Sequence, residues 1–515
     1  MKVKTIKNCI GNYPFIPLII LLIAMSMLLK KYMIEGFGEP DSARIGVSVI
    51  NMVKNGNSSP LSTYYFSDNI PLYVILLKSI VKFIGNNFQL LPQIMNQLGI
   101  FFSIINLFIA YVFTRKITKN EIVALTVVIF YFLIPGFFIS AIYGFPHIIS
   151  NTFFIASLYF FTKSISDQSN TVCNIVMVTV FMFLSISLKS DIVLFLGAYL
   201  GLLFYYDKLN KKNLLILLIQ LAISFLLFYF MRNLFLPNLQ GSTTSTHNFK
   251  EWLSRFTSFN LTLSSFFQYQ IKPILYTFGV LTNILLLTVL FLIFIQKKWK
   301  MLKLFLSWTF VPTIFWMLIF GNSARHNFAN ILPVVILITS YFYNSLKNKG
   351  FIAIVFIILF NMIITPPNSS TGLPSAKIFQ SSVLINQKRN NNHRIGEYIT
   401  STISDNVYIF GSYHNPWIIY EIIKDCDSYN VEALPGLENY SLDVINNNHK
   451  KNFKIFYLYK TIKDLPSEII KLQKTYNLTN EGLYISLIGN IEILTKNGII
   501  VKSISTTSDN RIIIK

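Results

Sequence analysis

Long apolar runs recur through most of the chain and are separated by short polar segments. A run of about 17–25 apolar residues is long enough to cross the hydrocarbon core of a bilayer as an α-helix. The pattern therefore predicts an α-helical polytopic membrane protein with about eleven transmembrane helices. The predicted spans are residues 15–33, 94–113, 122–139, 148–162, 172–188, 192–206, 214–231, 274–295, 304–320, 328–343 and 351–364.

Basic residues gather in polar segments between the runs. If the N-terminus is cytoplasmic and each run spans once, all of these clusters lie inside, as the positive-inside bias requires. The segment 71–85 is apolar but carries Lys78 and Lys82. Counting it as a span would place the later clusters outside, so we expect an interfacial helix on the outer face. The clusters are Arg115, Lys116 and Lys119; Lys163; Lys208, Lys211 and Lys212; Lys297, Lys298 and Lys300; and Lys347 and Lys349.

The same topology predicts the domain organisation. Residues 1–365 form a transmembrane domain whose outer loop, 30–93, contains interfacial helices, and residues 366–392, which begin with Pro366 and Pro367, form a linker. Residues 393–515 are expected to be a small soluble α/β domain outside the membrane, with strands near 406–411, 453–459, 483–487 and 499–504 and helices near 394–403, 417–424 and 466–472. The protein is thus predicted to be a multi-pass protein of the cell (plasma or inner) membrane with a cytoplasmic N-terminus.

Composition narrows the function classes. Of 515 residues, 53% are hydrophobic and 13% charged, the reverse of what a soluble chain of this length needs. The net charge of +22 comes from residues between apolar runs, which argues against a nucleic-acid partner. The 3 cysteines are too far apart to indicate a disulfide framework or a zinc site. Phosphate-loop, G-x-S-x-G and H-E-x-x-H motifs are absent from the sequence, so an ATP-driven pump or a hydrolase of those types is not supported.

The first outer loop carries the main catalytic candidates, Glu39 and Asp41. Pro40 stiffens the chain between them, and an amphipathic helix is expected over residues 42–54. A carboxylate fixed at the membrane surface can take a proton from an acceptor hydroxyl as that oxygen attacks a sugar carbon. The alternative is that Asp41 only caps its helix. Asp68, later in the loop, is a second acidic candidate, although Asp-Asn-Ile-Pro is also good turn chemistry.

Other polar groups stand at the expected outer ends of spans. Lys189 and Asp191 form a polar island that either binds a lipid-linked phosphate through Lys189 or is an internal ion pair. Arg325 has the forked donors that suit a phosphate, but an arginine there also snorkels to headgroups. His147 and His326 are further candidates for the same cavity, although a lone histidine is more often an interfacial group.

These motifs, taken in order, resemble the GT-C superfamily of polyprenyl-phosphate-sugar-dependent glycosyltransferases, which includes protein O-mannosyltransferases and the aminoarabinose transferase of lipid A. Residues 39–44 (EPDSAR) resemble the acidic motif after the first span, and residues 68–73 (DNIPLY) are similar to the start of the second interfacial helix, with Ile-Pro where many members have His-Pro-Pro or Pro-Pro. Leu188-Lys189-Ser190 looks like a lysine step between middle spans, and Ala324-Arg325-His326-Asn327 looks like the Arg-Tyr turn, with His326 replacing Tyr. The resemblance covers about residues 13–345.

The resemblance implies an inverting transfer of a sugar from a polyprenyl (undecaprenyl) phosphate carrier to an envelope glycan, lipid or protein acceptor on the outer face. Asp41 would be the base, with Glu39 beside it; Lys189 and Arg325 would neutralise the departing phosphate; and Arg44, Asp68, His147 and His326 would line the substrate cavity. The resemblance requires no nucleotide or other cofactor and leaves a divalent metal optional, and no metal site is predicted. An O-antigen glycan is one acceptor that fits an AT-rich, bacterial type of composition.

Two other classes remain open at this point. An envelope polysaccharide polymerase, ligase or lipid-linked-glycan flippase also has many spans and outer arginines, but a polymerase or ligase typically carries its large outer loop late in the chain. A secondary transporter would favour internal repeats and charges at mid-membrane. The early acidic loop and the charges at the outer ends favour the transferase.

Overall fold

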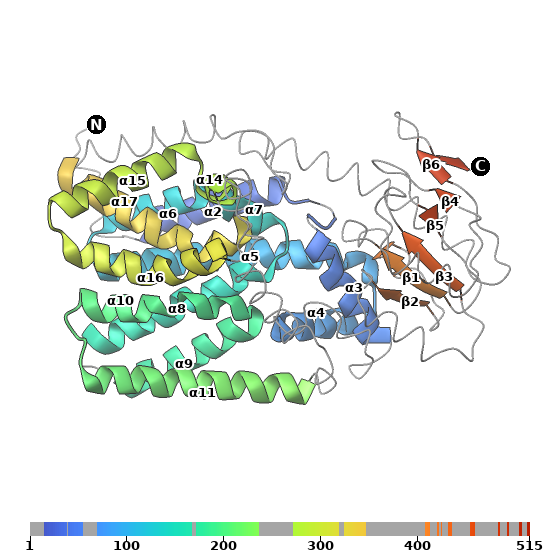
Figure 1. The fold of residues 1–515 in the computed structure, drawn as a ribbon, viewed down its shortest axis with the longest axis horizontal. Helices are drawn as coiled ribbons and strands as arrows, with labels where there is room; N and C mark the ends of the chain where they lie inside the picture. Colours follow the sequence, from blue (N-terminus) through green and yellow to red (C-terminus); the bar gives the residue numbers. More distant parts are fainter. Residues whose placement is uncertain are drawn as a thin grey trace.

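The computed structural model describes residues 15–34, 36–38, 40–54, 70–166, 171–235, 271–318 and 324–346, together with short strand and helix segments between residues 407 and 514. Most of this is a bundle of roughly antiparallel helices (Figure 1). Its elements in chain order are α2 (Phe15–Lys31), α3 (Pro40–Lys54), α4 (Pro71–Phe83), η1 (Phe88–Leu90), α5 (Leu91–Thr118), α6 (Glu121–Leu133), α7 (Pro135–Ile142), α8 (Pro146–Ser166), α9 (Thr171–Leu188), η2 (Ser190–Phe195), α10 (Gly197–Tyr205), α11 (Lys211–Phe235), α14 (Lys272–Phe278), α15 (Val280–Ile295), α16 (Trp299–Leu318), η5 (Ala324–Asn330) and α17 (Ile331–Leu346).

Apolar helices occupy the predicted spans. Each predicted run up to residue 343 overlaps a described helix, and the run 351–364 lies outside the described residues. By length and composition, 4 helices of the described part are long and apolar enough to cross a membrane, or up to 5 if one bent pair is a single span. Three shorter helices, Val172–Leu188, Ser190–Tyr205 and Val280–Ile295, are also apolar. The protein is therefore a helical, membrane-type protein, and the total of about eleven spans stays a prediction.

Two predicted spans are broken where the backbone cannot continue a helix. The run 122–139 divides into α6 and α7, which are bent by 66°. Pro135 lacks an N–H group and disfavours the helical conformation of the residue before it, so Ile134 is extended, with φ −66° and ψ 127°. The run 274–295 divides into α14 and α15 at Gly279, whose φ of 79° and ψ of 155° only glycine adopts readily.

Small residues allow a close contact between α10 and α16. Gly197 and Gly201 stand one turn apart on α10 and face α16. A Cβ atom built on Gly197 would lie 2.1 Å from the carbonyl oxygen of Ser307, and one on Gly201 would lie 3.0 Å from that of Leu304. This G-x-x-x-G spacing lets the two backbones approach without side chains between them, which is how helices associate where the surrounding solvent is lipid.

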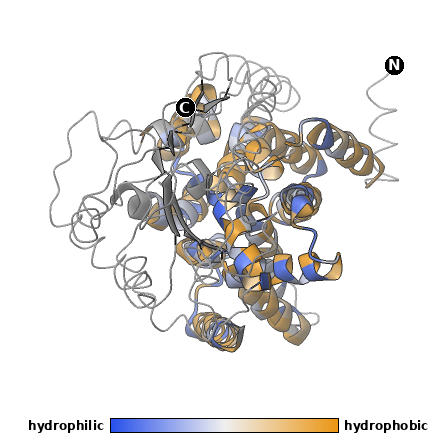
Figure 2. Cartoon of the chain, turned by 90° about the vertical axis from the view of Figure 1, so that its right-hand side faces the viewer, coloured by the Kyte–Doolittle hydropathy of each residue, from blue (hydrophilic) through white to orange (hydrophobic). Residues whose placement is uncertain are grey.

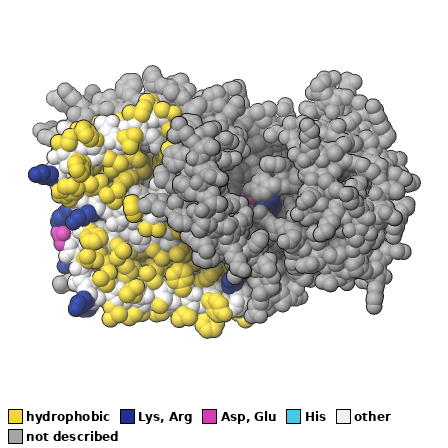
Figure 3. Space-filling model, in the orientation of Figure 1, with side chains coloured by type: hydrophobic (Ala, Val, Ile, Leu, Met, Phe, Trp, Pro, Cys, Tyr) yellow, Lys and Arg dark blue, Asp and Glu magenta, His cyan; other side chains and the backbone are white. Residues whose placement is uncertain are grey.

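Helices of the bundle are rich in hydrophobic residues (Figure 2), and hydrophobic side chains cover much of the described part of the face shown in Figure 3. Large hydrophobic side chains are exposed along α2, α11 and α15, including Met27 (69%), Phe230 (66%) and Leu287 (68%). A soluble monomer rarely exposes apolar patches of this extent, whereas a lipid-facing surface requires them. Lys and Arg side chains gather at one end of the bundle, at the left in Figure 3, where α10 ends and α11 and α16 begin. The exposed lysines there are Lys208, Lys211, Lys212, Lys297, Lys298 and Lys300.

The described C-terminal segments include a three-stranded parallel sheet of order β2-β1-β3, formed by β2 (Val431–Leu434), β1 (Val407–Gly411) and β3 (Lys454–Leu458). Val407 of β1 pairs with Val431 of β2 and with Lys454 of β3. Two antiparallel pairs follow, β4 (Leu483–Tyr484) with β5 (Glu492–Ile493) and β6 (Ile504–Thr506) with β7 (Ile512–Ile514). Strands thus overlap the predicted positions, while the α/β domain as a unit and its linker stay predictions.

Candidate functional site

The start of α3 carries Asp41 and Arg44. The helix begins at Pro40, two residues before the predicted start, because proline suits the first helical position, where no backbone N–H is needed. Asp41 therefore lies inside the first turn, where a carboxylate is favoured by the helix dipole. Its Oδ1 atom lies 3.5 Å from Nη1 of Arg44, and the side chains are only 5% and 2% exposed. The acidic candidate is thus a buried, charge-paired group.

Contacts from two other segments fix the chain around Asp41. Asn96 of α5 donates from Nδ2 to the carbonyl oxygens of Ile34 and Gly36, both at 2.9 Å, on the segment leading into α3. Ser42 Oγ donates to the carbonyl oxygen of Tyr143 at 3.1 Å. The first turn of α3 is therefore held against the turn between α7 and α8.

Tyr73 of α4 supports the same turn from the other side. Its hydroxyl donates to the carbonyl oxygen of Gly144 at 2.6 Å. Burial raises the pKa of Tyr73 well above its ordinary value, so the hydroxyl stays protonated and remains a donor. Gly144 has a φ of 65°, and a Cβ atom there would lie 2.8 Å from Met95, so the turn requires glycine. The loop helices α3 and α4 are thereby both tied to one turn of the bundle.

A cleft opens just beyond this turn, between α8, η2 and η5. Its empty volume, which includes space open to solvent, is about 300 Å³. The lining residues are His147, Ser150, Asn151, Lys189, Asp191, Ile192, Phe195, Phe328 and Ala329. The predicted candidates His147 and Lys189 therefore share one cleft, which has both charged and aromatic walls.

Lys189 enters this cleft as an ion pair. Its Nζ atom lies 2.8 Å from Oδ2 of Asp191, and the two side chains are 11% and 26% exposed. The internal pairing that the sequence left open is therefore present. It does not use all the hydrogen-bonding capacity of the lysine, because an ammonium group has three donors.

The α8 wall of the cleft carries His147 and, one turn further into the bundle, Asn151. Residues four apart lie on the same face of a helix, so both side chains belong to this wall. Asn151 is 1% exposed, and its Nδ2 atom donates to the hydroxyl of Tyr131 at 2.9 Å. Its Oδ1 atom is buried without a hydrogen-bond partner among the described residues. Ser150 is used structurally, because its Oγ donates to the carbonyl oxygen of Ser185 at 2.8 Å.

The third wall comes from η5. Phe328 and Ala329 line the cleft, and Phe328 stacks on Phe137 of α7 with ring centroids 5.8 Å apart. Arg325 and His326 belong to the same short helix, which places their backbone beside the cleft, but their side chains lie outside the described set. Glu39 and Asp68 also lie outside the described residues.

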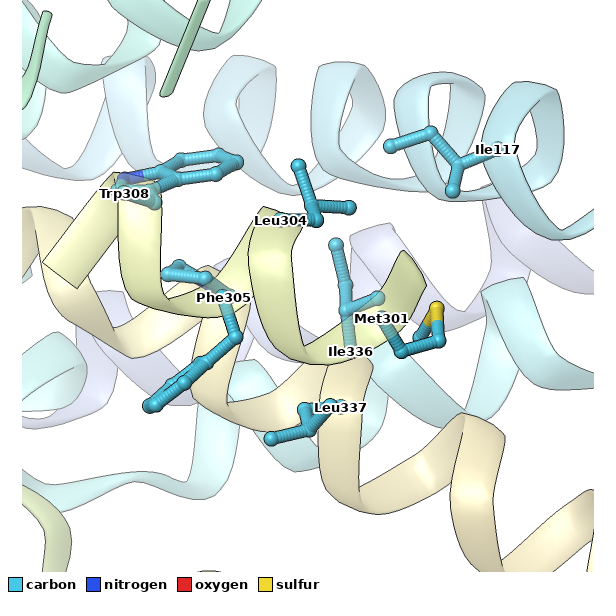
Figure 4. Close-up of a pocket in the computed structure, with 8 residues that line it drawn as sticks. Ile117, Met301, Leu304, Phe305, Trp308, Ile336 and Leu337 are labelled. Atoms are coloured by element: carbon cyan, nitrogen blue, oxygen red, sulfur yellow. The ribbon is translucent and has the colours of Figure 1, made fainter. Parts of the chain in front are cut away.

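A second hollow of about 270 Å³ lies between α5, α16 and α17 and is lined by Ile117, Met301, Leu304, Phe305, Trp308, Pro333, Ile336 and Leu337 (Figure 4). Its walls are aliphatic and aromatic, without a carboxylate, imidazole or ammonium group. Of the two hollows, only the cleft at Lys189 combines charged groups with a place for a ligand. Among the described residues, no group of three or more His, Cys, Asp or Glu is arranged to hold a metal ion.

The structure thus brings His147 and Lys189 together in one cleft. It also holds the first turn of α3, which carries Asp41, against Tyr143 through Ser42. Sequence reasoning missed Asn96, Tyr73 and Asn151. The only signal available for the two asparagines was a polar side chain inside an apolar run, which in a membrane span needs a partner or a ligand.

A search by sequence finds no family model that matches the chain, and no curated protein matches it either. Among solved structures, the crystal structure of ArnT from Cupriavidus metallidurans bound to undecaprenyl phosphate is similar, with a TM-score of 0.60 and 11% identity, over 94% of this chain and 99% of that one. ArnT from the same organism in the apo state gives 0.57 and 10%, over 93% and 98%. This chain and ArnT share a fold along nearly their whole length. The shared fold agrees with the predicted resemblance to the GT-C superfamily.

Proposed function

We propose that this protein is a glycosyltransferase of the cell membrane that moves a sugar from an undecaprenyl-phosphate carrier to a glycan, lipid or protein acceptor on the outer face. The observation that carries the proposal is the cleft that contains Lys189 and His147. Ser42, the residue after the buried Asp41, is hydrogen-bonded to Tyr143 in the turn that leads into His147. The fold supports it, because a protein of the same fold binds undecaprenyl phosphate. The basic end of the bundle would face the cytoplasm and the cleft the outside.

Asp41 is the proposed general base. It would take the proton of the acceptor hydroxyl while that oxygen forms a bond to the anomeric carbon of the sugar. The bond between this carbon and the carrier phosphate breaks, its electron pair leaves with the phosphate, and the configuration at carbon inverts. Arg44, whose Nη1 atom lies 3.5 Å from Oδ1 of Asp41, would hold the carboxylate in place. Glu39, two residues earlier, is the second acidic group proposed for this step.

Lys189 and Arg325 are the proposed phosphate ligands. Negative charge grows on the leaving phosphate in the transition state, and fixed cations at that point lower the barrier most. Lys189 is held by Asp191 at the edge of the cleft, with two further donors for phosphate oxygens. Arg325 belongs to the helix that forms the opposite wall. His147, His326 and Asp68 complete the proposed cavity, and the apolar side of the bundle would hold the prenyl chain.

The direct test uses the full-length protein in detergent micelles with a panel of undecaprenyl-phosphate-linked hexoses and pentoses. A crude envelope extract supplies acceptors, and mass spectrometry follows loss of the donor and appearance of undecaprenyl phosphate. We expect one donor to be consumed by the wild type. The matched control is the same preparation of Asp41→Asn, which removes the proton acceptor with little change in size. Consumption of no donor, or equal consumption by both proteins, overturns the assignment.

A further inference from the structure

Asn151 is a buried side chain of the cleft whose hydrogen bonding is incomplete among the described residues. Its Nδ2 atom is committed to the Tyr131 hydroxyl at 2.9 Å, whereas Oδ1 has no partner there. Of the other residues that line the cleft, Ile192, Phe195 and Phe328 have no side-chain donor, and Ser150 Oγ donates to the carbonyl oxygen of Ser185. The ammonium group of Lys189 is paired with Asp191. A buried carbonyl oxygen left in this state destabilises the protein unless a ligand or a water molecule donates to it.

The chemistry of this acceptor restricts what binds it. A phosphate diester at neutral pH has only acceptor oxygens, so it cannot hydrogen-bond to Oδ1, and a prenyl chain has no polar group at all. A sugar hydroxyl is a donor that fits. A hydroxyl also accepts, so it satisfies either orientation of the asparagine amide. The group that meets Asn151 is therefore on the sugar and not on the carrier.

The location agrees with this chemistry. Lys189 shares the cleft with Asn151. The donor sugar is bonded directly to the carrier phosphate, so a phosphate bound at Lys189 brings the sugar into the same cleft. Asn151 is also almost completely buried, at 1% exposure, so water competes poorly for the site once a sugar fills it. A site built to hydrogen-bond a hydroxyl rejects an analogue that lacks it much more strongly than an apolar pocket rejects a missing methylene group.

We propose that Asn151 is a specificity-determining residue that accepts a hydrogen bond from one hydroxyl of the donor sugar. This proposal rests on the proposed function, because it takes a lipid-linked sugar as the occupant of the cleft. It assigns to Asn151 the discrimination between sugars that differ at a single carbon, while Lys189 binds the part common to all donors.

The test measures binding, so that it does not depend on turnover. Native mass spectrometry of the full-length protein first identifies the tightest binder among undecaprenyl-phosphate-linked hexoses and pentoses. Each monodeoxy form of that sugar is then compared with the parent. We expect the wild type to bind one deoxy form roughly 10- to 100-fold more weakly than the parent, and Asn151→Leu to bind this pair about equally. The other deoxy forms keep their ranking in the variant.

Tyr131→Phe is the matched control, because it removes the partner of Nδ2 without altering the cleft lining. A merely structural Asn151 would make both variants lose affinity for all donors alike, and that result overturns the proposal. Unchanged discrimination in Asn151→Leu overturns it as well. If the wild type binds no lipid-linked sugar, this proposal and the proposed function fall together. If it binds and discriminates through Asn151 but transfers nothing, only the proposed function falls.

Discussion

The pairing of Asp41 with Arg44 allows the catalytic and structural roles of Asp41 to be separated. At 3.5 Å, two unit charges attract by about 5 kcal/mol at the effective dielectric constant of about 20 that suits protein sites. Because both side chains are almost completely buried, Asp41→Asn removes one charge of a buried ion pair, which typically costs about 3–5 kcal/mol of stability. Loss of a general base independently slows transfer by roughly 100- to 10,000-fold, or about 2.7–5.5 kcal/mol in the barrier.

A double variant separates these two effects. Asp41→Asn with Arg44→Leu removes both charges of the pair, so we expect it to regain much of the stability lost in the single variant. Transfer should stay lost, because no carboxylate has returned. Stability is measured by thermal unfolding in detergent, and transfer by mass spectrometry of the lipid-linked donor. Arg44→Leu alone is the control, and it should keep part of the transfer because it keeps Asp41.

Recovery of transfer together with stability in the double variant would refute this reasoning. It would mean that Asp41 serves only to neutralise Arg44, which is a structural role like the helix-capping alternative considered from the sequence. Wild-type transfer by Asp41→Asn alone would refute it more simply.

Three further predictions concern the cleft and its supports. Lys189→Met should raise KM for the lipid-linked donor more than it lowers kcat, measured by steady-state transfer; an unchanged KM contradicts the phosphate role. Asn96→Leu should lower transfer while thermal unfolding shows a folded bundle, because two backbone carbonyls ahead of α3 lose their donor; full activity would show that α3 needs no such support. Gly197→Ala should lower the free energy of unfolding by about 1–3 kcal/mol and Gly201→Ala should lower it by less. The reason is that the added carbon meets a backbone oxygen at 2.1 Å in the first case and at 3.0 Å in the second. Thermal unfolding in detergent measures the difference, and equal unfolding temperatures of the two variants would contradict the close approach of α10 and α16.

Much of the architecture was predictable because it depends on local pattern. Apolar runs fall on helices, and the lysines expected inside gather at one end of the bundle. The break at Pro135 was readable from the residue itself, although the sequence analysis treated the run as one span. The G-x-x-x-G spacing of Gly197 and Gly201 was also present in the sequence, but which helix it faces was not.

The candidate site was predictable only in part. Lys189 and Asp191 are near neighbours in the chain, so their ion pair was foreseeable. By contrast, the hydrogen bond from Ser42 to Tyr143 joins residues 101 positions apart, and the one from Asn96 to Ile34 joins residues 62 apart. No periodicity in the sequence encodes such pairs, because they depend on which helices become neighbours.

The sequence by itself determined that the protein is of a membrane type. It also determined the positions of most described helices and the end of the bundle at which the lysines gather. These follow from the transfer of side chains between water and lipid, which acts on each segment separately. The tertiary structure alone decided that α3 docks on the turn beside His147, that His147 and Lys189 share a cleft, and that Asn151 presents an acceptor there. The physical reason is that these features arise from close packing between segments distant in the sequence. Each polar group buried there needs a hydrogen-bond partner from the protein, from water or from a ligand.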